Sequence, residues 1–152
     1  MKRLVCLLTS LLLLCGSLSA CGGSNHKKVA ESFCEAIATG DMNLLKDSCH
    51  PSIFPELRSS VLPGIEESGA PADNGKYKIN LTEKGACSSQ KIHSIEDWYY
   101  SELEISLSID EAYLYQCKIE FADDEGDWGE WEEFSVASAK IDGKWYALPL
   151  YE

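Results

Sequence analysis

Seven cysteines and three histidines are the side chains with the most versatile chemistry in this sequence, because a thiolate is a strong nucleophile and an imidazole transfers protons near neutral pH. The histidines are His26, His50 and His93, and none has an aspartate or cysteine at the spacing of a catalytic dyad or a metal site. No G-x-S-x-G, P-loop or H-E-x-x-H motif occurs in the sequence. We therefore predict surface histidines, no catalytic residue, no metal site and no cofactor.

An acidic segment that contains tryptophan, residues 123–133, is the most unusual local feature. Its carboxylates alternate partly like those of a calcium loop, but Trp128 stands where an EF-hand needs its glycine. Tryptophans among acids also suit contact with a cationic or sugar ligand. We expect instead a solvated hairpin tip whose tryptophans pack across strands.

The N-terminus has the pattern of an export signal. Lys2 and Arg3 precede an apolar run over residues 4–15, which is shorter than the roughly 20 residues that span a bilayer. The sequence LSAC at residues 18–21 then closely resembles the lipobox of bacterial lipoproteins. The resemblance implies a signal peptide over residues 1–20, lipid attachment at Cys21 and a tether over residues 21–25. The alternative is an ordinary secretory signal that is cut after Ala20.

Lipidation would place the mature protein on the outer face of the cell membrane, or on the outer membrane of a Gram-negative cell. Removal of residues 1–20 takes away Lys2 and Arg3, so the net charge changes from −12 to −14. This charge disfavours nucleic acid and anionic lipid head groups as partners. We expect the membrane to be a partner through the lipid anchor alone, together with an unknown small ligand or protein.

The first half of the mature chain predicts helices. Apolar residues recur with helical spacing over residues 26–39, and Gly40 is placed to end that helix. Asp41 can cap a second helix whose apolar face ends at Cys49. Pro55 suits the first turn of a short third helix that carries Leu57 and Val61. Residues 63–76 are rich in glycine, proline and acids, and they predict a loop.

The second half changes to an apolar period of two, which is typical of strands. We predict strands over residues 77–82, 113–121 and 131–141, and a helix that begins at a cap on Ser94, ends near residue 103 and runs into extended chain. Asp142-Gly143 predicts a tight hairpin that pairs Ala139 with Tyr146 and Ala137 with Leu148. Pro149 predicts an edge strand or a strand end. The fold class is therefore α+β, with N-terminal helices packed on a curved antiparallel sheet.

Four cysteines remain after processing, since Cys6 and Cys15 leave with the signal: Cys34, Cys49, Cys87 and Cys117. In an antiparallel pair of helices, Cys34 and Cys49 stand at a similar height from the turn. We therefore predict Cys34–Cys49 and Cys87–Cys117 disulfides in an oxidising compartment. The alternative is four buried free thiols that pack as small hydrophobic residues.

Both ends of the mature domain resemble one superfamily. VAESFCEAIATGDMNLLKDSC at residues 29–49 resembles the opening of NTF2-like (cystatin-like) domains, and AKIDGKWYALPL at residues 139–150 resembles their closing hairpin. The chain looks closest to small uncharacterised lipoproteins of Firmicutes. The resemblance implies one NTF2-like domain over residues 26–152, in which a curved sheet wraps the first helix as a cone with a pocket at its open end.

Aromatic residues supply the candidate pocket of that cone. They share large, mostly apolar rings that can line a cavity, and they are Phe33, Trp98, Tyr113, Tyr115 and Tyr146. None of the positions that we assign to the interior carries a carboxylate or an imidazole, so we predict a non-catalytic binding module. The alternative is an isomerase-like or hydrolase-like enzyme that uses the same pocket, as some members of the superfamily are.

Overall fold

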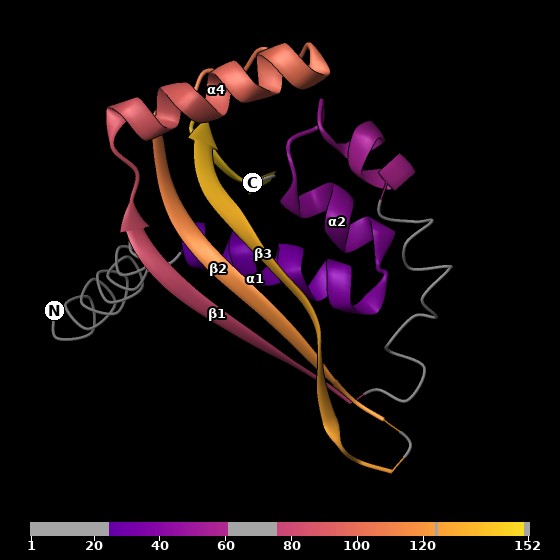
Figure 1. Ribbon diagram of the computed structural model, residues 1–152. Coiled ribbons are helices and arrows are strands. Elements are labelled where there is room, and N and C mark those ends of the chain that lie inside the picture. The colour runs from indigo at the N-terminus through magenta and orange to yellow at the C-terminus, as the bar shows by residue number, and fades with distance from the viewer. Residues whose placement is uncertain (1–24, 61–75, 124, 151–152) are drawn as a thin grey trace, which may run out of the picture.

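The computed structural model describes residues 25–60, 76–123 and 125–150. Its centre is a four-stranded antiparallel sheet with the strand order β1-β2-β3-β4. The sheet is strongly curved, with α1 and α2 to one side of it and α4 across one end (Figure 1). The protein is therefore α+β, with N-terminal helices packed on a curved antiparallel sheet, as the sequence predicts.

The helix α1 (Asn25–Thr39) forms because its small and apolar residues fall on one buried stripe. Gly40 follows it with φ +68°, a left-handed conformation that glycine adopts without strain. The Asp41 side chain then accepts hydrogen bonds from the backbone N–H groups of Asn43 (2.9 Å) and Leu44 (3.1 Å). These bonds cap the start of α2 (Met42–Ser48), so both helices are confirmed.

The chain after α2 returns to the sheet. Cys49 forms an isolated parallel bridge with Ala147, so this segment borders the edge of the last strand. Residues 54–60 form the predicted third helix, in which Leu57 is buried. Val61 and most of the predicted loop over residues 63–76 lie outside the described residues.

The strands are β1 (Tyr77–Ala86), β2 (Glu111–Ala122), β3 (Trp128–Ile141) and β4 (Lys144–Leu150). The β3–β4 register pairs Ala139 with Tyr146 and Ala137 with Leu148, which confirms the predicted hairpin. Asp142 and Gly143 have φ values of +51° and +77°, as a tight turn of this kind needs. Pro149 lies in β4, an edge strand of the sheet.

The predicted start of the fourth helix is wrong. The cap of helix α4 (Ser89–Leu103) lies six residues earlier than predicted, because Ser88 is extended and its side chain accepts from the Lys91 N–H at 3.2 Å. Ser94 lies inside the helix, and its hydroxyl donates to the Gln90 carbonyl at 2.9 Å. The strand β3 likewise begins at Trp128 rather than at residue 131.

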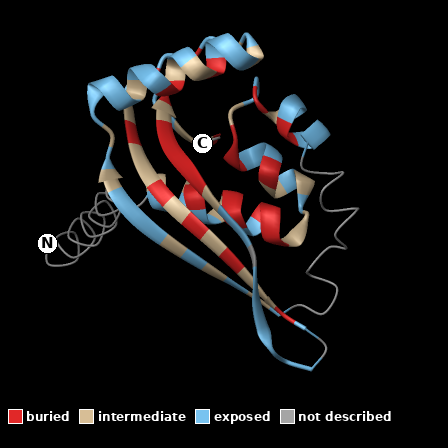
Figure 2. Cartoon of the chain, in the orientation of Figure 1, coloured by how far each residue is buried: buried red, intermediate tan, exposed pale blue. Residues whose placement is uncertain are grey.

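The sheet has two covered faces and an exposed arm. Ser138 of β3 contacts the first turn of α1, whereas Leu114 of β2 lies under α4 on the other face. Beyond this body, the β2–β3 hairpin continues as an arm, residues 118–123 and 125–133, that is mostly exposed toward its tip (Figure 2). Among the described residues, no helix is long and apolar enough to cross a membrane.

Candidate functional site

A cluster of mostly aromatic side chains surrounds His26 in the first turn of α1. This group, here called the His26 cluster, consists of His26, Tyr113, Tyr115, Trp145 and Glu83. The imidazole of His26 stacks on the ring of Tyr113, with 3.9 Å between centroids and 8° between planes. Trp145 packs beside both rings, at 5.5 Å from His26 and 6.0 Å from Tyr113. Side chains of two strands, β2 and β4, therefore contact the single imidazole of α1.

A chain of hydrogen bonds runs through the Tyr115 hydroxyl. The hydroxyl donates to Oε2 of Glu83 at 3.1 Å, and Nδ1 of His26 lies 2.5 Å from the same oxygen. A phenol has one hydrogen, so when Tyr115 donates to Glu83, Nδ1 of His26 must carry a proton and donate to Tyr115. The two hydrogen bonds therefore run in one direction, from His26 to Tyr115 and from Tyr115 to Glu83.

Tyr115 is held as a neutral hydroxyl. Burial raises its pKa above the ordinary value of 10, and the hydrogen bond to the Glu83 carboxylate raises it further. The pKa of Tyr113 is raised as well, first by its hydrogen bond to Glu111 at 3.2 Å. Both phenols are therefore hydrogen-bond donors at neutral pH rather than bases.

The sheet register brings these residues together. Glu83 pairs with Tyr115 across β1 and β2, and the register shifts directly afterwards at Gly85, whose φ of +109° suits a β-bulge. Tyr113 pairs with Ser138 across β2 and β3, and the Ser138 hydroxyl donates to the His26 carbonyl at 2.6 Å. The first turn of α1 is therefore bonded directly to the sheet.

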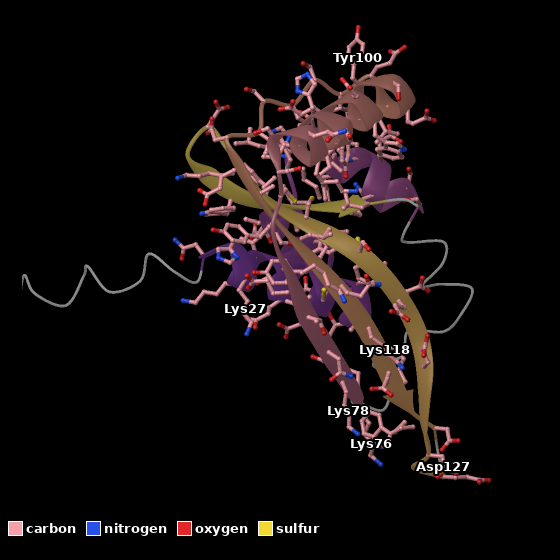
Figure 3. The ribbon with its side chains drawn as sticks, turned by 60° about the vertical axis from the view of Figure 1, so that its left-hand side comes forward. Lys27, Lys76, Lys78, Tyr100, Lys118 and Asp127 are labelled. Carbon is pink, nitrogen blue, oxygen red and sulfur yellow. The ribbon has the colours of Figure 1, made fainter. Side chains whose placement is uncertain are left out.

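A groove between α1 and β1, here called the α1 groove, adjoins the cluster. Its volume is about 450 Å³, and its lining residues are Lys27, Glu31, Glu35, Ile79 and Leu81 (Lys27 is labelled in Figure 3). Leu81 lies two residues before Glu83 on the same face of β1, and the charge of Glu31 contributes to the raised pKa of Tyr115. The groove thus has an aliphatic wall, a wall with two carboxylates, and the Tyr115 hydroxyl beside it.

A second groove, the α4 groove, lies on the other face of the sheet. Its volume is about 140 Å³, and it is lined by Lys91, Ser94, Ile95, Trp98, Tyr99, Leu114, Ser135 and Leu150. The hydroxyl of Tyr99 already donates to the Pro149 carbonyl at 2.7 Å. This space is smaller, and its lining includes one cation and no carboxylate.

The five aromatic residues predicted for the pocket lie in four places. Tyr113 and Tyr115 meet in the His26 cluster, but Phe33 is buried in the core, with its ring edge-on to Phe134 at 6.2 Å. Trp98 lines the α4 groove, and Tyr146 packs edge-on against His50 at 5.0 Å. Of the five, the structure therefore brings only the two tyrosines of β2 together.

The prediction of surface histidines is wrong for two of the three. His26 is half-buried in its cluster, and the signal for this was present, because Ala30, Phe33 and Ile37 continue its stripe along α1. His50 is half-buried against Tyr146, and this burial lowers its pKa below the ordinary 6.5 while Asp142 partly opposes the shift. His93 is exposed and pairs weakly with Glu96 at 3.4 Å.

The acidic segment forms the tip of the arm, as predicted. Oδ1 of Asp123 accepts from the backbone N–H groups of Glu125 (3.0 Å) and Asp127 (2.8 Å), so this carboxylate closes the turn. Trp128 is 43% exposed and has the ammonium of Lys78 3.6 Å from its ring centroid. Lys118 and Lys78 lie along the arm and Asp127 at its end (Figure 3). Within the described residues, no group of three His, Cys, Asp or Glu side chains is placed to hold a metal ion.

The four cysteines of the described residues are free in the structure, so the predicted Cys34–Cys49 and Cys87–Cys117 bridges are not formed there. The thiol of Cys34 instead contacts that of Cys117, and this hydrogen bond is the main reason that the pKa of Cys34 is raised. Burial raises the pKa of Cys49 to about 11. Cys21, the predicted lipid-attachment residue, lies outside the described residues.

No protein-family model matches the chain, and no curated protein matches it. Its function therefore has to be derived from the chemistry of its own residues.

Proposed function

We propose that the protein is an exported lipoprotein, held on the outer face of a membrane by lipid on Cys21, with an NTF2-like domain over residues 26–152 that binds a ligand without turning it over. The LSAC sequence at residues 18–21, after a basic start and a short apolar run, supports cleavage and lipidation. Two or more acyl chains anchor a protein stably, whereas a single chain binds only marginally.

The ligand site that we propose is the α1 groove with the Tyr115 hydroxyl beside it. The observation that carries this proposal is the meeting of an apolar wall, Ile79 and Leu81, with two carboxylates in a groove of about 450 Å³. The Glu31 carboxylate pairs with the Lys27 ammonium at 3.7 Å, so Glu35 is the carboxylate that we propose for the cationic head. Pockets of this kind bind through apolar contact and are oriented by a few polar groups. The ligand that fits is a short apolar chain with a cationic head.

Binding fits the site better than catalysis does. The pKa of Tyr115 is raised, so its hydroxyl stays protonated, and Nδ1 of His26 is engaged with that hydroxyl. General base catalysis needs an acceptor that is free to take a proton from the substrate. The Tyr115 hydroxyl and Nδ1 of His26 do not meet that need while the hydrogen-bond chain is intact, which leaves Nε2 of His26 as the one acceptor of this pair.

The same chain of hydrogen bonds favours one second candidate, an isomerase-like or hydrolase-like enzyme. Glu83, Tyr115 and His26 could pass a proton if a substrate displaced one of the contacts. The substitution Tyr115→Phe separates the two functions. A binding module would keep most of its affinity, whereas an enzyme of this kind would lose its turnover.

The short tether would limit the distance between the domain and the membrane. Four residues, 21–24, precede Asn25 at the start of α1, and at about 3.5 Å per residue they reach about 14 Å. A lipid on Cys21 would hold the His26 cluster near the bilayer. Tyr115 and Ala122 are seven residues apart along β2, or about 23 Å, so the arm extends farther from the His26 cluster than the tether reaches.

Acyl labelling of the full chain in bacterial cells tests the anchor. We expect an alkyne analogue of palmitate to label the wild type, and Cys21→Ala to abolish labelling and to release the protein from the membrane fraction. The matched control is Cys15→Ala, which changes a cysteine of the signal and should leave labelling intact. Labelling that persists in Cys21→Ala contradicts the proposed anchor.

Isothermal titration calorimetry tests the ligand class. The full lipidated chain in lipid nanodiscs is titrated with n-butylammonium or n-butyrate, with empty nanodiscs as the reference. We expect n-butylammonium to bind and n-butyrate not to bind. Glu35→Gln should weaken binding by roughly threefold to fivefold, since an exposed ion pair contributes up to about 1 kcal/mol. The matched control is Glu120→Gln on the arm, and equal losses in the two variants contradict the site.

A further inference from the structure

Two buried thiols meet between α1 and the centre of the sheet. Cys34 lies on the buried stripe of α1, and Cys117 lies near the middle of β2 between Tyr115 and Ile119, in the part of the sheet that α1 covers. Both cysteines have no exposed surface. Cys117 pairs with Phe134 in the β2–β3 register, and the Phe134 ring lies edge-on to that of Phe33, the neighbour of Cys34, at 6.2 Å. The two thiols therefore lie on facing parts of α1 and β2, and the interaction with Cys117 is the first cause of the raised pKa of Cys34.

We infer that Cys34 and Cys117 form a disulfide bond in the exported protein. This inference rests on the export proposed above, because disulfides persist in oxidising compartments. A disulfide needs Cβ atoms about 3.5–4.5 Å apart, a separation that facing positions on a packed helix and strand can reach. The pairing differs from the one that helix geometry predicts, since the contact partner of Cys34 is on the sheet rather than on α2.

The other two cysteines have separate surroundings. Cys49 is buried after α2, with its backbone beside β4 at Ala147. Cys87 is half-buried between β1 and α4, and its N–H donates to the Ala112 carbonyl at 2.8 Å. The domain would therefore hold one disulfide and two thiols.

Formation of the bond needs an oxidant, and the class that fits is a disulfide-bearing thiol oxidoreductase. The Cys34 thiolate attacks one sulfur of the oxidant disulfide, which forms a mixed disulfide and releases one oxidant thiol. The Cys117 thiolate then attacks the Cys34 sulfur and releases the second oxidant thiol. Two protein thiols are oxidised, one oxidant disulfide is reduced, and the two protons end on the oxidant thiols.

Burial of the two thiols determines the stage of folding at which this exchange can occur. Both thiols are inaccessible in the folded domain, and burial with the mutual hydrogen bond raises the pKa of Cys34 far above the range in which thiolates form. Oxidation must therefore precede the docking of α1 on the sheet. Once formed, the bond would fix α1, one wall of the α1 groove, to β2.

Thiol mapping of the exported full chain tests the inference. The protein is isolated from the membrane fraction, denatured in the presence of a thiol-alkylating reagent, digested without reduction and analysed by mass spectrometry. We expect a cross-linked peptide pair that contains Cys34 and Cys117, with Cys49 and Cys87 alkylated. In Cys34→Ser, Cys117 should become alkylated, and in the matched control Cys49→Ser the cross-link should remain.

Acyl labelling of Cys21 in the same sample separates failure of this inference from failure of export. An acylated protein with all four thiols alkylated, or with Cys34 linked to Cys49, overturns the disulfide and leaves the lipoprotein proposal standing. If Cys21 is not acylated, the full chain is refolded with oxidised and reduced glutathione. Formation of the Cys34–Cys117 link then supports the inference, and its absence overturns it.

Discussion

The two faces of the sheet show how burial and chemistry are distributed in this protein. The α1 face combines a buried core, the His26 cluster and an open groove of about 450 Å³. The α4 face is covered by a helix that buries only Ile95 and Tyr99, over a groove of about 140 Å³. Two carboxylates line the groove of the first face, and none lines the groove of the second.

This difference teaches that enclosure alone does not define a ligand site. The α4 groove also has polar lining residues, Lys91, Ser94 and Ser135, but no carboxylate lines it and the Tyr99 hydroxyl is bound to the Pro149 carbonyl. In the α1 groove, the Glu31 and Glu35 carboxylates and the neighbouring Tyr115 hydroxyl stand beside an aliphatic wall. Orientation of a ligand needs such polar groups next to apolar surface.

The largest effect should come from removing the core ring under α1. Phe33→Ala should lower the free energy of unfolding by about 3–5 kcal/mol, because Phe33 is buried and packs against Phe134. Trp98→Ala on α4 should cost less, because Trp98 is only half-buried. Urea unfolding followed by circular dichroism measures both values. A larger loss for Trp98→Ala would reverse the ranking of the two faces.

The His26 cluster should contribute a smaller, separate amount. His26→Ala removes the stack on Tyr113 and the hydrogen bond to Tyr115, and it should cost about 1–2 kcal/mol. The control is Lys28→Ala, an exposed residue of the same turn, which should change stability by less than about 0.5 kcal/mol. Equal losses in the two variants would show that the cluster adds nothing beyond helix propensity.

The stability of the protein should depend on pH through His50. Burial lowers the pKa of His50 below its ordinary 6.5, so the unfolded chain binds its proton first as the pH falls. Stability should therefore be full above pH 6.5 and should fall as the pH drops from there to the lowered folded-state pKa. His50→Gln should flatten this slope and His93→Gln should not, as measured by urea unfolding at a series of pH values. An unchanged slope in His50→Gln contradicts the assignment of this pH dependence to His50.

Local signals explain which elements could be predicted from the sequence. The Asp41 cap, Gly40 and the Asp142–Gly143 turn each depend on neighbouring residues, and the structure confirms them. The predicted start of α4 was wrong because a serine can cap a helix or bond back to the carbonyl four residues earlier: Ser88 caps α4, whereas Ser94 donates to the Gln90 carbonyl.

The His26 cluster could not be predicted from single helices and strands, because it depends on how they are arranged relative to one another. His26, Glu83 and Tyr115 come from one helix and two strands, and their meeting follows from the β1–β2 register with its bulge at Gly85. The aromatic residues of the predicted pocket were grouped by type, but alternation along a strand sends neighbouring side chains to opposite faces of a sheet. Tyr115 therefore joins the His26 cluster while Leu114, its neighbour in β2, lies under α4.

Methyl NMR of the full lipidated chain in nanodiscs tests the central claim most directly, because both grooves carry methyl groups. Ile79 and Leu81 line the α1 groove, and Leu114 and Leu150 line the α4 groove. On titration with n-butylammonium, we predict that the methyl signals of Ile79 and Leu81 shift while those of Leu114 and Leu150 stay in place. Shifts confined to Leu114 and Leu150, or shifts at none of the four residues, would contradict the claim that the α1 groove is the ligand site.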